Sequence, residues 1–193
     1  MKERPIIFSS DMVKAILDGR KTQTRRILST LNKQWKGKQP LEILPMKTPN
    51  EWVGLMQRDP NRGIVFKCRL GVPRDRLWVR ESFYTESGDV WYKADGQTAP
   101  MPIKWRPSIF MPRWASRILL EITEVRVERL QSITEEDAEA EGLNPAEYDN
   151  PNAYADLPCT NQFIALWGSL NAKRGYGWTE NPFVWVISFR KLG

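Results

Sequence analysis

The amino-acid sequence predicts an α+β fold that is mainly β, a small closed β-barrel plugged by short helices. Three observations favour this class. Strand-like alternation recurs along the chain, the helical patterns are few and short, and 193 residues suit one domain of ordinary size. We therefore expect residues 1–193 to form a single domain with two long insertions, at about 32–62 and 144–158.

The N-terminal part predicts one helix and one extended segment. Apolar residues at helical spacing mark a helix over Ser10–Leu17, and Gly19 stands where a left-handed C-terminal cap belongs. Residues 21–28 predict an extended or turn segment with an unusually dense set of polar side chains. From Asn32 to Arg62 the composition becomes polar and four prolines occur, which indicates a long insertion loop over the body.

The middle of the chain carries the clearest strand patterns. Residues 63–70 and 76–83 alternate between apolar and polar side chains, and a turn rich in Gly, Pro and Asp separates them at 71–75. A long strand is expected over 117–130. Its apolar residues fall in two registers, which predicts a β-bulge near Thr123.

The C-terminal part predicts two helices and a last strand. Thr134 is placed to cap a helix that would end at Gly142 after about two turns. The second insertion, 144–158, leads into a helix over 161–170. Residues 183–189 then form the last expected strand.

Composition removes several kinds of chemistry. The chain has no histidine, which argues against a Ser-His-Asp triad, a Cys-His dyad and a His-ligated metal. Its two cysteines, Cys68 and Cys159, lie far apart and fit no paired metal-ligand spacing. We therefore expect no metal and no cofactor, and any catalysis must use Lys, Thr, Glu, Asp, Tyr or Cys.

Charge and aromatic content favour a polyanionic or nucleoside partner. The net charge is +6, and nine tryptophans offer rings that can stack on bases, although many of them are expected to fill the core. A nucleoside or a single-stranded RNA is the partner that these features fit. No apolar run approaches the length of a signal peptide or a membrane span, so we expect a cytoplasmic protein with no membrane partner.

The segment 19–26 concentrates hydrogen-bond donors and a candidate nucleophile directly after the first helix. By composition alone it is also a plausible solvated basic turn. Its pattern, Gly19-x-Lys21-x-x-Thr24-x-Arg26, resembles the signature of the ASCH domain, a β-barrel superfamily related to the RNA-binding PUA domains. Residues 71–81 resemble a second landmark of that family, and residues 111–117 and 183–186 resemble its phage and prophage branch.

The resemblance implies a site and an activity. One ASCH group is a bacterial amidohydrolase that removes the acetyl group from N4-acetylcytidine with a Lys, a Thr and a Glu. By that likeness Lys21 would be the base, Thr24 the nucleophile and Glu141 the acid. The candidate residues for binding substrate or RNA are arginines and one tryptophan: Arg25, Arg26, Arg113, Trp114 and Arg117.

Several alternatives stay open at this point. The same pocket could belong to a non-catalytic module of phage origin that binds RNA or a modified base. Two further candidate functions are a ribonuclease and a phage morphogenesis accessory protein. Each residue also has a plainer role: Glu141 is also typical of a solvated Glu-rich helix, and Lys21 of a point charge that binds phosphate.

Overall fold

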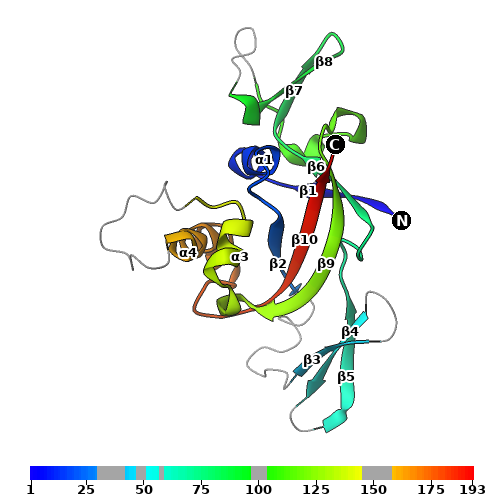
Figure 1. Ribbon diagram of the computed structural model, residues 1–193, viewed down its shortest axis with the longest axis vertical. Helices are drawn as coiled ribbons and strands as arrows, with labels where there is room; N and C mark the ends of the chain where they lie inside the picture. Colours follow the sequence, from blue (N-terminus) through cyan, green and yellow to red (C-terminus); the bar gives the residue numbers. More distant parts are fainter. Residues whose placement is uncertain (30–41, 47–50, 57–58, 97–103, 145–157) are drawn as a thin grey trace.

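The protein is mainly β, with a few short helices, as the sequence predicts. The computed structural model describes residues 1–29, 42–46, 51–56, 59–96, 104–144 and 158–193. Two long curved strands, β9 (Leu119–Arg129) and β10 (Phe183–Leu192), run through the middle of the molecule. Helices α3 (Glu135–Ala140) and α4 (Pro158–Asn171) lie on one side of them (Figure 1).

The main sheet is open, which corrects the expectation of a closed barrel. Its order is β1 (Glu3–Ile7), β6 (Arg76–Arg80), β9, β10 and β2 (Gln23–Ile27), with β1 parallel to β6 and the other neighbours antiparallel. Among the described strands, β1 and β2 form the two edges and do not pair with each other. Closure is not needed to bury the strands, because separate apolar clusters cover the two faces of the sheet.

Strand β10 joins these two clusters. Trp185, Ile187 and Phe189 belong to a cluster that also contains apolar residues of helix α1 (Ser10–Leu17) and of β1, β6 and β9. Val184 and Val186 point to the opposite face, where they pack with residues of α3 and α4. Successive strand residues alternate between faces, so an almost continuous apolar sequence is what a strand buried on both sides requires.

The predicted bulge in β9 is confirmed. Ser188 of β10 lies opposite Glu124, and the next residue, Phe189, lies opposite Ile122, so Thr123 is the extra residue. An extra residue shifts every later side chain to the other face. This explains why the apolar residues of this strand occupy two registers in the sequence.

The local helix signals are also confirmed. Helix α1 begins after Ser9 and is followed by Gly19 at φ +78°. Thr134 caps α3, since its side chain accepts a hydrogen bond from the backbone N–H of Asp137, and Gly142 follows α3 at φ +91°. Both glycines have the left-handed conformation that ends a helix.

The first insertion is not only a loop. Strands β3 (Glu42–Pro45), β4 (Glu51–Met56) and β5 (Asp59–Lys67) form a three-stranded antiparallel sheet within and just beyond it. The rings of Trp52 and Phe66 pack edgewise on Trp185, at centroid distances of 4.8 and 5.7 Å. Tertiary packing thus outweighs the polar, proline-containing composition. Almost all of the second insertion lies outside the described residues.

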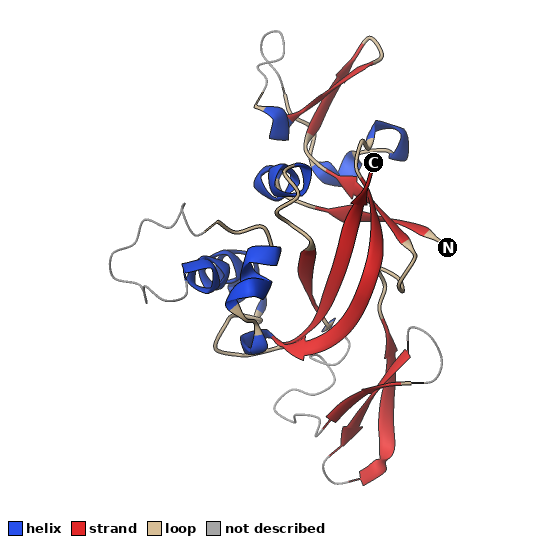
Figure 2. Ribbon diagram, in the orientation of Figure 1, coloured by secondary structure: helices blue, strands red, loops and turns tan. Residues whose placement is uncertain are grey.

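Smaller elements complete the chain (Figure 2). Strands β7 (Phe83–Glu86) and β8 (Asp89–Tyr92) form a hairpin that extends from one end of the molecule. Single 3-10 turns follow it: η1 (Lys93–Asp95), η2 (Ser108–Phe110) and η3 (Arg113–Ala115). Two others, η4 (Leu130–Ser132) and η6 (Ala172–Arg174), follow β9 and α4.

Candidate functional site

Lys21 lies where the chain passes from helix α1 to strand β2. Its backbone N–H donates to the carbonyl of Ala15 at 2.9 Å, and the next N–H, of Thr22, donates to the carbonyl of Ala140 at 2.9 Å. These bonds fix the segment between α1 and the end of α3. The Lys21 side chain is only 1% exposed, so its amine is held inside the protein.

The amine of Lys21 is bonded to Glu141, which follows α3. Nζ donates to Oε2 of Glu141 at 2.7 Å and to the backbone carbonyl of the same residue at 2.6 Å. The side chain of Glu141 is 8% exposed. The other carboxylate oxygen, Oε1, receives no hydrogen bond from any described residue. A buried acceptor without a donor is costly, so a bound molecule with a hydrogen-bond donor would be stabilised here.

Burial dominates the electrostatics of Lys21. Removal from water lowers the pKa of Lys21 below its ordinary value, and the charges of Arg26 and Arg25 lower it further. Glu141 opposes this change through its charge and its hydrogen bond. A lysine with a lowered pKa gives up its proton more readily than a solvated one, which a general base needs.

Gly142 permits the close approach of the α3 end to Lys21. A Cβ at this position would lie 2.9 Å from the Cβ of Lys21 and 2.8 Å from that of Ala15. The carbonyl of Gly142 also accepts a hydrogen bond from Nη1 of Arg20 at 2.9 Å. The glycine predicted as a helix terminator therefore also sets the distance between the two halves of the site.

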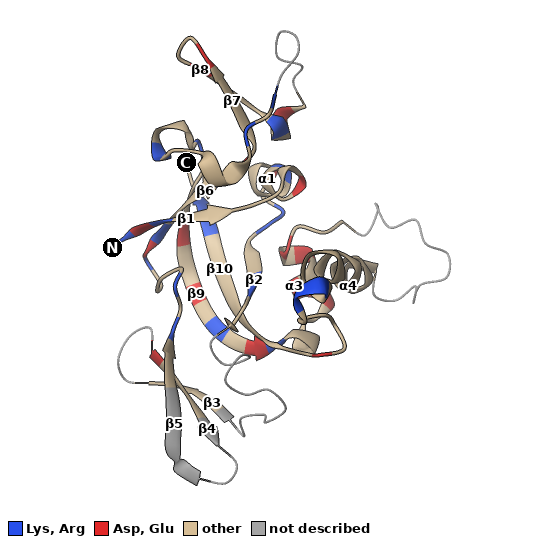
Figure 3. Cartoon of the chain, turned by 180° about the vertical axis from the view of Figure 1, so that it is seen from behind, with Lys and Arg blue, Asp and Glu red and all other residues tan. Residues whose placement is uncertain are grey.

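Arg25 holds the acidic side of the site and is itself fully buried. Its Nη2 donates to Oδ2 of Asp137 at 2.8 Å and its Nη1 to Oε1 of Gln23 at 2.5 Å, while Nη1 lies 3.6 Å from Oε1 of Glu141. Figure 3 shows strand β2, which carries basic residues, beside helix α3, which carries acidic ones. Arg25 also lines the cavity, and these bonds hold its guanidinium in place within the site.

Asp137 completes this network. Burial opposes its ionisation, but the charges of Arg25 and Arg126 and the hydrogen bonds from Gln23 and Arg25 prevail and lower the pKa of Asp137. The carboxylate therefore stays charged at neutral pH. Its hydrogen bond holds the guanidinium of Arg25 in place, with Nη1 at 3.6 Å from Oε1 of Glu141.

Thr24 and Arg26 lie on the opposite face of β2 from Arg25, as strand alternation requires. Thr24 is 4% exposed, and its hydroxyl has no hydrogen-bond partner within the described part of the chain. Arg26 donates from Nη2 to the carbonyl of Ile7 at 2.8 Å and stacks over Phe8, with 5.2 Å between its guanidinium carbon and the ring centroid. Thr24 thus lines the same cavity as Lys21 and Arg26.

These residues line a cavity of about 560 Å³ beside the edge strand β2. Lys21, Thr24, Arg26 and Glu141 form part of its polar wall. Helix α4 supplies an apolar wall, from side chains spaced along one face: Phe163, Leu166, Trp167 and Leu170. The volume lies in the range of about 300–1,000 Å³ that small-molecule pockets span. The arrangement suits a ligand with one polar, reactive end and one flat or apolar side.

The apolar wall was not part of the sequence-based site. A signal for it exists, because the apolar residues of the predicted helix 161–170 recur at helical spacing. That spacing normally indicates a face that packs on a core. Only the tertiary arrangement shows that α4 packs on the sheet through Phe163 and Trp167 and also borders the cavity.

Three of the predicted binding residues lie away from this cavity. Arg117 forms two hydrogen bonds to the buried carboxylate of Glu81 and two to Asp95, and it stacks on Tyr92. Arg113 pairs with Glu3 at 3.1 Å. Trp114 is 69% exposed on the surface. None of the three lines the cavity.

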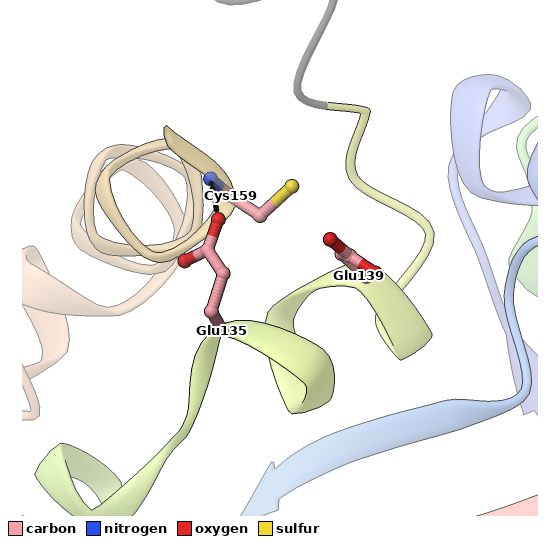
Figure 4. Close-up of side chains that lie close together, drawn as sticks. All are labelled: Glu135, Glu139 and Cys159. Atoms are coloured by element: carbon pink, nitrogen blue, oxygen red, sulfur yellow. Dashed lines mark hydrogen bonds between the residues drawn. The ribbon is translucent and has the colours of Figure 1, made fainter. Parts of the chain in front are cut away.

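A group of potential metal ligands has a structural explanation. Within the described ranges, Glu135, Glu139 and Cys159 lie close together (Figure 4). The carboxylate of Glu135 accepts hydrogen bonds from the N–H groups of Cys159 and Thr160, at 2.7 and 2.9 Å, so it satisfies the start of α4. Burial and the two carboxylates raise the pKa of Cys159 to about 11, which keeps its thiol protonated.

The length and apolar content of the described helices can be compared with those of a membrane span. None of them is long and apolar enough to cross a lipid bilayer. Helix α4 has 14 residues, and its apolar side chains face the second cluster and the cavity. A membrane span needs roughly 20 apolar residues.

Comparisons with known proteins give two distant likenesses. The sequence matches no family profile and no curated protein. A protein of Enterococcus faecalis V583, described with the family DUF984, has a TM-score of 0.41 at 12% identity over 93% of this chain, which spans 65% of that protein. An ASCH domain of Lactobacillus crispatus JV V101 has a TM-score of 0.39 at 17% identity, over 98% of this chain and 79% of that one.

Proposed function

We propose that the protein is an amidohydrolase that deacylates N4-acetylcytidine or a related modified nucleoside. One observation carries the proposal: a buried amine, a buried carboxylate and a buried threonine side chain line the same cavity. The sequence resemblance of residues 19–26 to the ASCH signature supplies the substrate class. The apolar face of α4 suits the flat pyrimidine ring.

The Lys21–Glu141 pair suits acid–base chemistry without histidine. Transfer of one proton along the 2.7 Å hydrogen bond turns the ion pair into a neutral amine and a neutral carboxylic acid. Burial favours the neutral amine of Lys21 because it removes the solvation of the ammonium charge. The same transfer therefore prepares a base for one step and an acid for another.

The reaction would proceed through an acyl-threonine. Lys21 takes the proton of the Thr24 hydroxyl as Oγ1 attacks the acyl carbonyl carbon and forms a C–O bond. The C–N bond to the exocyclic nitrogen then breaks as Glu141 gives that nitrogen a proton, which releases cytidine. A water molecule then attacks the ester carbonyl carbon and gives a proton to Glu141. The C–Oγ1 bond breaks as Lys21 returns its proton to Oγ1, and the carboxylic acid is released. Arg26, at the same wall, would stabilise the oxyanion.

Turnover of N4-acetylcytidine tests the proposal. We expect cytidine release by the wild type, followed by chromatography, and a loss of at least about 100-fold in Thr24→Val and in Lys21→Met. Thr22→Val is the matched control, since Thr22 is exposed and contributes its backbone alone. Full activity in Thr24→Val would exclude the acyl-threonine route. Loss in Thr22→Val as well would indicate a general fault of the segment.

A binding module is the second candidate, and one observation favours it. The amine of Lys21 is committed to Glu141, and no hydrogen bond joins it to Thr24 among the described contacts. Such a site can grip a modified base without converting it. In that case calorimetry would show N4-acetylcytidine bound stoichiometrically while no cytidine forms, and Glu141→Gln would weaken binding.

A further inference from the structure

A second surface is built around turns η2 and η3. It shares no residue with the lining of the cavity. Residues 104–115 are held on the body by Phe83, whose N–H donates to the carbonyl of Arg106 at 3.2 Å and whose carbonyl accepts from its N–H at 2.8 Å. Met111 and Ala115 are buried against the ring of Phe83. The segment is therefore anchored from one side.

The other side of this segment presents large apolar side chains to solvent. Ile109 is 58% exposed, Phe110 63% and Trp114 69%. They stand among the most exposed large hydrophobic residues of the described chain. A clustered group of exposed apolar residues on an ordered frame is typical of an interaction site.

All charged side chains of this segment are basic, and Arg113 is paired with Glu3 at 3.1 Å. No acidic residue occurs between Asp95 and Glu121, whereas Lys104, Arg106 and Arg113 lie in this interval. Lys104 and Arg106 form no ion pair with any acidic residue that the structure describes, and both are exposed. Arg106 also stacks on the ring of Phe83, with 5.2 Å between its guanidinium carbon and the ring centroid. The surface therefore combines exposed apolar rings with two exposed cations.

We propose that this surface, formed by residues 104–114, binds a single-stranded polynucleotide. Successive bases would stack on Phe110 and Trp114, while Lys104 and Arg106 would contact the phosphates. A single strand fits better than a duplex, because only unpaired bases expose their faces to side chains. No residue of the surface lines the cavity, so this binding is independent of the proposed hydrolase activity.

The proposal predicts a salt-dependent affinity. Single strands lose affinity with a logarithmic slope of about 0.7 for each phosphate contact. Two contacts imply about sevenfold weaker binding when salt rises from about 50 to 200 mM. Substitution of Lys104 should reduce that slope by about 0.7. Stacking on one ring contributes enough that its removal should weaken binding by about fivefold or more.

Fluorescence anisotropy with the full-length protein tests the proposal. The probes are labelled oligo(U), oligo(dT) and a duplex, each of about 12 nucleotides or base pairs. We expect both single strands to bind more tightly than the duplex, and Trp114→Ala and Phe110→Ala to weaken them at least about fivefold. Val65→Ala, at a residue 50% exposed on β5, and Lys14→Ala on α1 are the matched controls and should bind as the wild type does.

Several results would overturn the proposal. One is unchanged affinity in both Trp114→Ala and Phe110→Ala; another is an equal preference for duplex. Loss of binding in Thr24→Val with normal binding in Trp114→Ala would move the strand to the cavity. A dimer that becomes monomeric only in Trp114→Ala, measured by sedimentation, would assign the surface to a second copy of the chain. The anisotropy assays measure binding and do not depend on turnover. Their results therefore test this surface even if the protein does not hydrolyse N4-acetylcytidine.

Discussion

The ammonium group of Lys21 lies 2.7 Å from a carboxylate oxygen of Glu141, although 120 positions separate the two residues in the chain. Both side chains are buried, and a backbone hydrogen bond from Thr22 to Ala140 joins the segment before β2 to the end of α3. The pair therefore links two distant segments and also borders the cavity. Its structural and chemical roles can be separated by experiment.

Breaking this pair should cost more stability than removing both partners. Lys21→Met or Glu141→Leu alone leaves one buried polar group without its partner, which costs about 3–5 kcal/mol for a charge. The double variant Lys21→Met/Glu141→Leu should recover most of that loss. Urea denaturation measures the free energy of unfolding. Asp18→Asn, in the exposed pair with Arg20, is the control and should change it by less than about 1 kcal/mol.

Additive losses in the double variant would contradict this account. They would indicate that each side chain contributes through packing rather than through the pair. Lys21 also packs against the ring of Phe8, with 5.5 Å from Nζ to the ring centroid, so part of its contribution is of that kind. The size of the recovery measures the part that belongs to the ion pair.

Gly142 should tolerate a methyl group far less well than Gly19. Both have positive φ, where alanine costs about 1–2 kcal/mol. A Cβ at Gly19 meets nothing within 4 Å, whereas at Gly142 it would collide with Ala15 and Lys21. We expect Gly142→Ala to lose about 1–3 kcal/mol more than Gly19→Ala in chemical denaturation. Equal losses would show that the end of α3 shifts freely.

Activity should depend on pH through Lys21. In the proposed mechanism the reactive form of the pair holds one proton, so the rate of cytidine release should fall as pH rises through the lowered pKa of Lys21 and that proton is lost. Arg26 lowers that pKa, so Arg26→Gln should move the midpoint to higher pH. Lys14→Ala removes a charge from the exposed face of α1 and should leave it in place. An unmoved midpoint in Arg26→Gln would point to another titrating group.

Local signals made much of the fold predictable. Helix caps, terminating glycines and the double register of 117–130 act through neighbouring residues, and the structure confirms α1, α3 and the bulge at Thr123. Long-range pairing was not accessible in the same way. Nothing in the local pattern shows that β1 lies parallel to β6 or that the sheet stays open. Nor does it show that Trp52, in the first insertion, packs on Trp185.

The candidate site divides along the same line. The resemblance to the ASCH signature implies Lys21, Thr24 and Glu141 as a set, and all three line one cavity in the structure. The partners of each side chain depend on tertiary packing. Arg25 and Arg117 are equally basic in the sequence, yet each is committed to buried or half-buried carboxylates. Charge in a sequence therefore indicates a partner without showing whether that partner is a ligand or the protein itself.

Glu135 should stabilise α4 only when it is ionised. Its carboxylate accepts from the N–H groups of Cys159 and Thr160 and from the Thr160 hydroxyl, and these bonds outweigh burial and lower the pKa of Glu135. A lowered pKa contributes stability above the unfolded value of about 4.5, and that stability is lost as pH falls through the folded value. Glu135→Gln should therefore destabilise the protein by about 1–2 kcal/mol at pH 7.

The difference should shrink as the solution becomes acidic. Once Glu135 is protonated in the wild type, its carboxyl group resembles the amide of glutamine, and the two unfolding free energies should converge at a pH below the folded pKa of Glu135. Glu139→Gln is the matched control, because Glu139 lies on the same helix and is exposed. Thermal unfolding of the three proteins at several pH values measures the effect. A difference that is constant with pH would show that Glu135 acts through packing and not through its charge.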